Sequence, residues 1–390
     1  MKRWWTTLVA VFGLLVIFSW GFVDPGLNSF ASTEMLRATQ VLRNIVFQSP
    51  VFAGLIFILL LTTLIISYVR VFTLPIESVQ YKKIWFVVGA LGVLGALAFP
   101  AFSYDVFNYI TTAKVTYFHG ENPYIVMPFE ILNEPYLAFT RAANKVALYG
   151  PLWILLTSIP HYLGHNNIWV TILVFKLTNA FWYLAFSFLI YRVTKSMKNV
   201  LFFAFNPLIL IEVLIAGHND IVMMFLATIG LIVWFQKGLS QKIVGLFFLI
   251  SSVLIKGATV VLLPLIFFRY LSRDRALFLA LCLLSVVFFF AAPIREELYP
   301  WYAVWIISPV AFLDLKKYKN VVIGTMILTA SLEFRHIPYM MTLSYAGWGV
   351  LFRILVSYVP VVLFLCYKVW NNRNIISSAM RVWKKTRIGQ

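Results

Sequence analysis

The stretch VFAGLIFILLLTTLIISY, residues 51–68, carries no charged side chain and decides the fold class. A helix that crosses a bilayer needs about 20 consecutive apolar residues, so this run is long enough for one span. Similar runs lie at residues 8–20, 84–102, 169–191 and 276–292. A soluble helical core of this size would need charged faces between the runs, and such faces are absent. We therefore predict a polytopic integral membrane protein.

Charged residues are scarce: they make up 12% of the 390 residues, against about 25% in soluble domains. Basic residues outnumber acidic ones by 32 to 14, which gives a net charge of +18. A basic chain can bind nucleic acid, but here Lys and Arg form short clusters between apolar runs, which is typical of cytoplasmic membrane flanks. We therefore expect membrane lipid as a partner, and no nucleic acid.

Placing the basic clusters in the cytoplasm predicts the topology. It has about twelve spans, within a range of about 11–13, with both termini cytoplasmic. Residues 1–390 then form a single integral membrane domain of the all-α class, a transmembrane helix bundle whose main extracytoplasmic loop is 103–150. We expect Leu152–Leu163 to be a re-entrant or half-buried helix, and Lys256–Gly257 to break an apolar stretch into two short helices.

Ten of the 14 acidic residues fall on the outer side of this topology. The rule that sets the topology depends on Lys and Arg alone, so this asymmetry is an independent observation. It predicts polar chemistry at the extracytoplasmic face of the cell membrane.

The first candidate site is Ser103–Tyr109, just past the outer end of the predicted third span. A partly desolvated carboxylate beside aromatic residues has a raised pKa, which suits Asp105 to general-base catalysis. Tyr104 and Tyr109 lie close to Asp105 on the helix that follows, and they are candidate substrate ligands. The alternative is that Asp105 is only the N-cap of this helix.

Two further motifs lie in the same loop. Asn122 and Tyr124 belong to His-Gly-Glu-Asn-Pro-Tyr, and Tyr149 precedes Gly150 and Pro151. All three side chains are candidate substrate ligands. The alternatives are a loop turn for the first motif and a helix start for the second, since Gly and Asn-Pro end helices and Pro fits the first helical position.

A fourth motif combines the intramembrane acid Glu212 with His218, Asn219 and Asp220. An acid within a span is costly and normally faces a polar cavity, so these residues are candidates for substrate binding, with Asp220 also a catalytic candidate. His218 and Asp220 could bind a divalent metal, but zinc sites generally have three or four ligands, so we assign no metal site and no certain cofactor. The alternative is an interfacial polar cap.

Two cations complete the candidates. A charged Lys256 at membrane depth needs an anion, either a lipid phosphate or Glu212. Arg295 can hold a phosphate bidentately or pair with a nearby acid. The acids concerned are Glu296, Glu297 and Glu333.

Trp301 and Tyr302 follow Arg295 in the chain. They are typical of an interfacial aromatic belt, and their ring faces can also stack on a sugar.

In this order, the motifs resemble those of the GT-C superfamily of polyprenyl-phosphate-sugar-dependent glycosyltransferases, and most of all the bacterial cell-envelope α-mannosyltransferases. The resemblance covers roughly residues 84–310. It rests on Ser103-Tyr104-Asp105 with Tyr109, Gly120-Glu121-Asn122-Pro123-Tyr124, Tyr149-Gly150-Pro151, Asn206-Pro207-Leu208 leading to Gly217-His218-Asn219-Asp220, Lys256, and Tyr299-Pro300-Trp301-Tyr302.

The resemblance implies many transmembrane helices, with amphipathic helices in the first large outer loop and an acidic catalytic base there, which is Asp105 in this chain. It implies the transfer of a sugar, with mannose the best match, from a polyprenyl-phosphate donor to a glycan or glycolipid acceptor. We expect a single displacement that inverts the anomeric centre. Lys256 and Arg295 would stabilise the leaving phosphate, and Glu212 would tune Lys256. This chain departs from the simplest members in having two spans before the span that leads to Asp105.

A transporter or flippase for a lipid-linked sugar is the alternative from another class. It explains the spans and the buried charges equally well, but it predicts repeated halves, and none is detectable in the sequence. A non-catalytic assembly partner is the third possibility.

Overall fold

The structure, a computed structural model, describes residues 2–77, 80–268, 271–295, 297–344 and 347–388, without the side chains of Lys2, Arg295 and residues 372–388. Every regular element in this part of the chain is helical, which confirms the all-α prediction. The α-helices are α1 (Lys2–Ser19), α2 (Thr33–Gln48), α3 (Pro50–Thr73), α4 (Tyr81–Ala96), α5 (Asp105–Tyr117), α6 (Pro151–Leu163), α7 (Ile168–Thr194), α8 (Met197–Ala204), α9 (Asp220–Trp234), α10 (Leu239–Ile255), α11 (Arg273–Val286), α12 (Ala292–Arg295), α13 (Val304–Val310), α14 (Lys319–Glu333), α15 (Ile337–Thr342) and α16 (Trp348–Ile388).

Several helices are long and apolar enough to cross a bilayer, which fits a polytopic membrane protein. The described residues contain five such helices, and six if the bent pair formed by α8 and the π-helix η6 (Ile209–Ile215) is one span. The five are Arg3–Phe22, Pro50–Thr73, Ile168–Thr194, Arg273–Ile294 and Trp348–Asn371. Fewer helices of full span length are present than the twelve predicted spans, because several apolar runs are divided. Pro207, for example, lies at the 64° bend between α8 and η6, where proline cannot continue the backbone hydrogen bonds of a helix.

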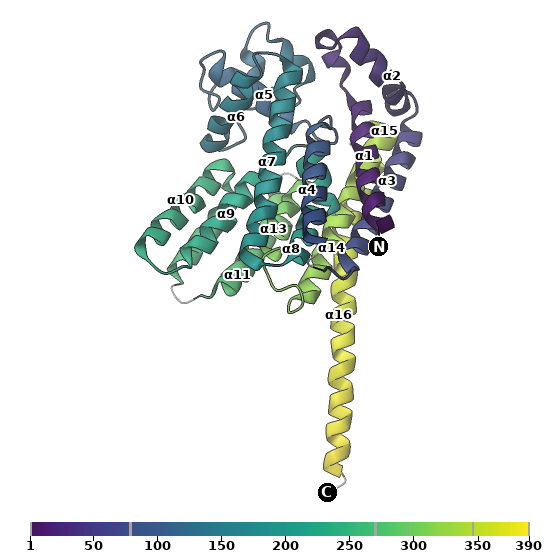
Figure 1. The fold of residues 1–390 in the computed structure, drawn as a ribbon, viewed down its shortest axis with the longest axis vertical. Coiled ribbons are helices and arrows are strands. Elements are labelled where there is room, and N and C mark those ends of the chain that lie inside the picture. Colours follow the sequence, from purple (N-terminus) through teal and green to yellow (C-terminus); the bar gives the residue numbers. More distant parts are fainter. Residues whose placement is uncertain (1, 78–79, 269–270, 296, 345–346, 389–390) are drawn as a thin grey trace.

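Helices α9 and α10 form a closely packed hairpin (Figure 1). A Cβ atom added to Gly245 would lie 2.7 Å from the backbone nitrogen of Trp234, so this approach requires a residue without a side chain. The α10 helix ends at Ile255. The backbone of Lys256, which follows, is extended (φ −158°, ψ 127°), and the 3-10 helix η7 (Gly257–Phe267) begins after it. The predicted break at Lys256 is therefore confirmed. The hairpin brings Asp220, at the start of α9, next to the end of α10.

Helices α2, α5 and α6 gather at the end of the molecule opposite to the one from which α16 extends (Figure 1). We call α5, α6 and the residues between them the α5–α6 lobe; it includes the predicted outer loop. The 13 residues of α6 span about 20 Å, less than the roughly 30 Å of a hydrocarbon core. This length agrees with the prediction that 152–163 is not a full span.

The α5–α6 lobe has its own buried ion pair. Glu134 accepts hydrogen bonds from Lys114 Nζ at 2.8 Å and lies 3.1 Å from His119 Nε2. Burial raises the pKa of Glu134, but the hydrogen bonds from Lys114, the Tyr136 backbone and His119 outweigh it and hold the pKa below its usual value. The carboxylate is therefore ionised at neutral pH and ties α5 to the turns that follow it.

Candidate active site

A cavity of about 970 Å³ lies between the α5–α6 lobe and the helical body. Its walls come from the start of α5, the residues before α6, the break between α10 and η7, and segments after residue 286. Six predicted site residues line it together, although they are far apart in the sequence. They are Tyr104, Asp105, Tyr149, Lys256, Trp301 and Tyr302.

Asp105 is the first residue of α5, but its carboxylate does not cap the helix. Its own backbone N–H donates to Ser103 Oγ at 3.2 Å, and Tyr104 occupies the N-cap position without a capping hydrogen bond. The Asp105 side chain is 22% exposed, borders the cavity, and has its Oδ2 3.3 Å from His218 Nδ1. The geometry thus favours the functional interpretation of Asp105 over the N-cap.

The protonation of Asp105 differs from the expectation. Burial raises its pKa, as predicted, but His218 and the charge of Lys256 outweigh burial, so the pKa is lowered overall. The predicted net rise is therefore wrong. Asp105 is ionised at neutral pH, which is the form that a general base requires.

His218 lies between two carboxylates. Its Nε2 is 3.1 Å from Glu212 Oε2, on the side of the ring opposite to Asp105, and its ring stacks on Trp301 with centroids 4.0 Å apart. Burial lowers the pKa of His218, but the two carboxylates raise it to about 9. Gly217 has φ +88°, a backbone conformation that L side chains rarely adopt, and so permits the turn that leads to His218.

Lys256 points into the cavity and is held by Asp220. Its Nζ lies 3.2 Å from Asp220 Oδ1, which also accepts a hydrogen bond from Trp305 Nε1 at 2.6 Å. The ring of Tyr302 lies 4.7 Å from the same ammonium group. Glu212 had been one candidate counter-ion for Lys256, and this assignment is wrong: Asp220 fills that role, and Glu212 faces two histidines.

Several predicted site residues lie beneath the cavity wall and do not line it. Glu212, His218, Asn219 and Asp220 are fully buried, and Tyr109 is 1% exposed. The N–H of Asn219 donates to the Tyr109 hydroxyl at 3.3 Å, so these residues support the wall in this structure. Their direct binding of substrate stays a prediction.

Lys176, on α7, fixes the segment that precedes His218. It is fully buried and donates hydrogen bonds to the carbonyl groups of Leu214 and Ile215, the latter at 2.5 Å. The last carbonyls of a helix have no partner within it, and in a bilayer they need one from elsewhere in the protein. No motif in the sequence points to this lysine.

Two residues that were predicted to bind substrate line a different pocket. Asn122 and Tyr124 line a surface depression of about 430 Å³, separate from the cavity, and the Tyr124 hydroxyl donates to the Tyr149 carbonyl at 2.9 Å. For Arg295 only the backbone, at the end of α12, is described, and Glu296 lies outside the described residues. The prediction that Arg295 binds phosphate stays a prediction.

The structure adds cavity residues that sequence reasoning missed. Arg353 Nε lies 2.9 Å from Glu297 Oε1, which Arg335 also contacts, and His336 borders the cavity beside them. The signal available in the sequence was the run Glu333-Phe334-Arg335-His336 at the end of an apolar segment. Other missed polar residues at the cavity are Asn108, Arg141, Lys145 and Tyr339.

Apolar helices of span length, with a carboxylate, a lysine and aromatic rings around one cavity, fit a membrane-embedded glycosyltransferase. Residues 7–271 match the sequence model of the family described as alpha-(1->6)-mannopyranosyltransferase, N-terminal domain. The chain belongs to this family, which confirms the resemblance and makes the protein a mannosyltransferase of the GT-C type. No curated protein and no solved structure matches the chain.

The family match also bears on the alternatives. It supports an enzyme and gives no support to a transporter or an assembly partner. The match begins at residue 7, so it covers nearly all of the two spans that come before the span leading to Asp105. Asp105, Asp220 and Lys256 lie inside it, whereas Trp301 and Arg335 lie beyond its end.

Proposed function

We propose that the protein transfers mannose from a polyprenyl-phosphate donor to a glycan or glycolipid acceptor at the extracytoplasmic face of the cell membrane. The observation that carries this proposal is that Asp105 and Lys256 face the same cavity. One is a carboxylate that can accept a proton, and the other is a cation that can face a phosphate.

The reaction is a single displacement. Asp105 accepts the proton of an acceptor hydroxyl, and the oxygen attacks the anomeric carbon of the donor sugar. The bond from that carbon to the phosphate oxygen breaks, and the electron pair leaves with polyprenyl phosphate. Negative charge grows on the phosphate, and Lys256, already oriented by Asp220, stabilises it.

The apolar part of the cavity wall supports a lipid-linked donor. Val287, Ala291 and Ala292 line it, and on the same helical segment Phe290 and Ile294 are 66% and 87% exposed on the outside. Such a wall continues into a membrane-facing surface, so a prenyl chain can lie there while its phosphate reaches Lys256. Trp301 and Tyr302 offer ring faces on which a sugar can stack.

The stereochemistry follows from a single displacement, which inverts the anomeric centre. The family description names an α-linked product. An α-mannoside formed with inversion requires a β-linked donor, so we propose that polyprenyl-phosphate β-mannose is used and its α anomer is not.

The extracytoplasmic placement rests on the distribution of Lys and Arg, which puts both termini in the cytoplasm. The cavity lies between the helical body and the α5–α6 lobe, whose residues include the predicted outer loop. This supports an active site on the side opposite to the termini. Thiol labelling of a Glu121→Cys variant in intact cells tests it, with Cys282 and Cys366, both exposed, replaced by Ser. Labelling of this variant only after lysis would overturn the placement.

The proposal is tested with purified protein in detergent. Radiolabelled polyprenyl-phosphate β-mannose and a nucleotide-activated mannose are each offered with a short α-mannoside acceptor. We expect transfer from the lipid donor only, and none by Asp105→Asn. Transfer from the nucleotide donor alone would overturn the donor class, and equal rates for wild type and Asp105→Asn would overturn the base.

A further inference from the structure

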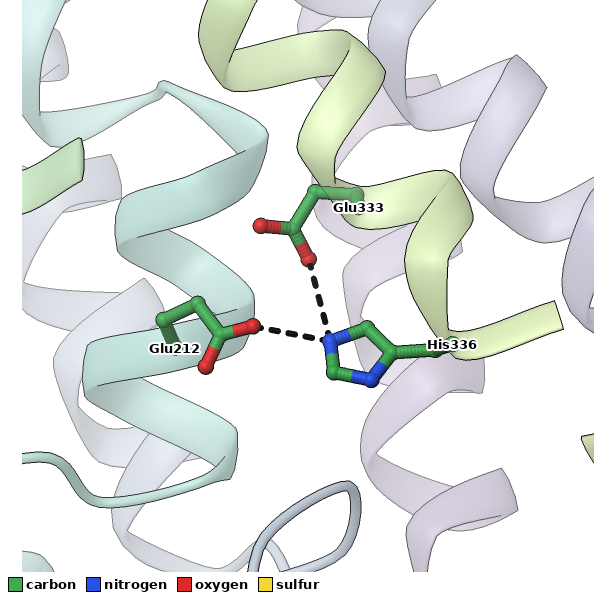
Figure 2. A group of neighbouring side chains, drawn as sticks. All are labelled: Glu212, Glu333 and His336. Carbon is green, nitrogen blue, oxygen red and sulfur yellow. Dashed lines mark hydrogen bonds and ion pairs between the residues drawn. The ribbon is translucent and has the colours of Figure 1, made fainter. Parts of the chain in front are cut away.

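A second cluster of ionisable side chains lies behind the cavity wall. Glu212 from η6, Glu333 from the end of α14 and His336 from the turn after it point toward one another (Figure 2). One possible ligand atom from each lies within 4.8 Å of the other two. None of the three is needed to accept the proton or to face the leaving phosphate.

Glu333 is the unusual member of the cluster. It is fully buried, and within the described part of the chain neither of its carboxylate oxygens has a hydrogen-bond partner. The nearest ionic group is His336 Nε2, 3.9 Å from Glu333 Oε2, and that nitrogen is already 2.8 Å from Glu212 Oε1. A buried carboxylate without a donor is costly, so something that binds carboxylates must offset this cost.

The charged groups around the cluster also indicate that Glu333 needs a cation. Three carboxylates, those of Asp105, Glu212 and Glu333, lie along one chain of contacts with two imidazoles, His218 and His336. His218 is shared by Asp105 and Glu212, which leaves Glu333 without a full partner.

We propose that Glu212, Glu333 and His336 bind one divalent metal ion that accepts both oxygen and imidazole ligands, such as Zn²⁺ or Mn²⁺. Two carboxylates and one imidazole are a ligand set that these ions take, with metal–ligand distances of about 2.0–2.2 Å for zinc. Ligand atoms of such a site are about 3–3.5 Å apart. An ion would therefore draw Glu333 closer to His336, which is now 3.9 Å away, and separate Glu212 slightly from His336, at 2.8 Å.

The position of His336 gives the ion a route to the site. The side chain is 11% exposed and borders the cavity, whereas both glutamates are fully buried. The ion would fix Glu212, whose other oxygen faces His218, and His218 in turn faces Asp105. Its role would be to hold this chain of contacts in place, and the proposal is independent of which sugar is transferred.

The competing explanation is a proton on Glu333, and the experiment separates the two. Purified full-length protein is dialysed first against EDTA and then against Zn²⁺ or Mn²⁺, and bound metal is measured by elemental analysis. We expect about one ion per chain in wild type and in Glu77→Gln, an exposed carboxylate control, and at least a tenfold loss of occupancy in Glu333→Gln.

A second measurement, on wild-type protein alone, tests the proposal even if Glu333→Gln does not fold. The apparent Tm of wild-type protein is measured with EDTA and after the metal is restored, and we expect restoration to raise it. Absence of bound metal in folded wild-type protein, with no change of Tm on adding either ion, would overturn the proposal. So would equal metal content in wild type and folded Glu333→Gln.

Discussion

The Nδ1 atom of His218 lies 3.3 Å from Oδ2 of Asp105, and the His218 ring does not line the cavity. Because His218 is fully buried, it cannot take a proton from an acceptor hydroxyl itself. We propose that His218 sets the charge and direction of Asp105, which does border the cavity. This separation of a buried partner from an accessible base leads to the first two predictions.

Replacing Asp105 with Asn removes the base and keeps the shape of the side chain. We expect the rate of transfer to fall by about 10²–10⁴-fold, the usual contribution of a general base, with little change in the KM for the donor. Gel filtration in detergent checks that the variant is folded. A folded Asp105→Asn protein with wild-type kcat would contradict the assignment.

Replacing His218 with Gln is expected to change the pH profile. The pKa of Asp105 is held below its ordinary value, so the wild-type rate should fall only at a pH below the usual range of carboxylates. Without the imidazolium, burial dominates and the pKa of Asp105 rises, which moves the acid limb of kcat/KM to higher pH. Profiles measured from about pH 4 to 8 check this, and an unchanged acid limb would refute it.

The pair formed by Lys256 and Asp220 predicts that its effects on stability and on catalysis can be separated. Lys256→Met leaves the buried Asp220 without its cation, and we expect a loss of about 3 kcal/mol or more in stability together with about 10²–10³-fold in rate. The double variant Lys256→Met/Asp220→Asn should regain much of the stability and none of the rate. Thermal unfolding and transfer assays on the three proteins separate the two roles. Recovery of activity in the double variant would show that Lys256 does not act on the donor.

Gly150 has a packing requirement that a single methyl group tests. A Cβ atom there would overlap the carbonyl oxygen of Leu254, a backbone atom next to the Lys256 break. We expect Gly150→Ala to cost about 1–3 kcal/mol and to lower the rate, because the backbone that presents Lys256 must shift. The matched control is Gly89→Ala on α4, where nothing lies within 4 Å of the added atom. Equal unfolding temperatures for the two variants would refute this prediction.

The sequence predicted the helical class, the break at Lys256 and the six motif residues that meet at the cavity. These depend on local apolar patterns and on a resemblance. The sequence did not predict that Lys256 pairs with Asp220 instead of Glu212. Glu212 lies in a π-helix, which changes the direction of the residues that follow it relative to a regular α-helix.

Other features depend on contacts between segments that are distant in the sequence. The net pKa of Asp105 is set by His218, which arrives from the η6–α9 turn. Arg335 and His336 reach the cavity from a segment that the motifs do not cover. No local pattern contains this information, because it depends on how the helices are rotated and packed.

The hydrogen bond from Gly150 N–H to the Ile255 carbonyl at 2.9 Å has an evolutionary consequence. It joins a residue of the α5–α6 lobe to the last residue of α10. The backbone at the Tyr149-Gly150-Pro151 motif therefore packs directly against the backbone at the Lys256 break. A substitution at either position is tolerated only if the other accommodates it. Gly150 and the residues around Lys256 should therefore vary together among related chains, and insertions should be excluded from both places.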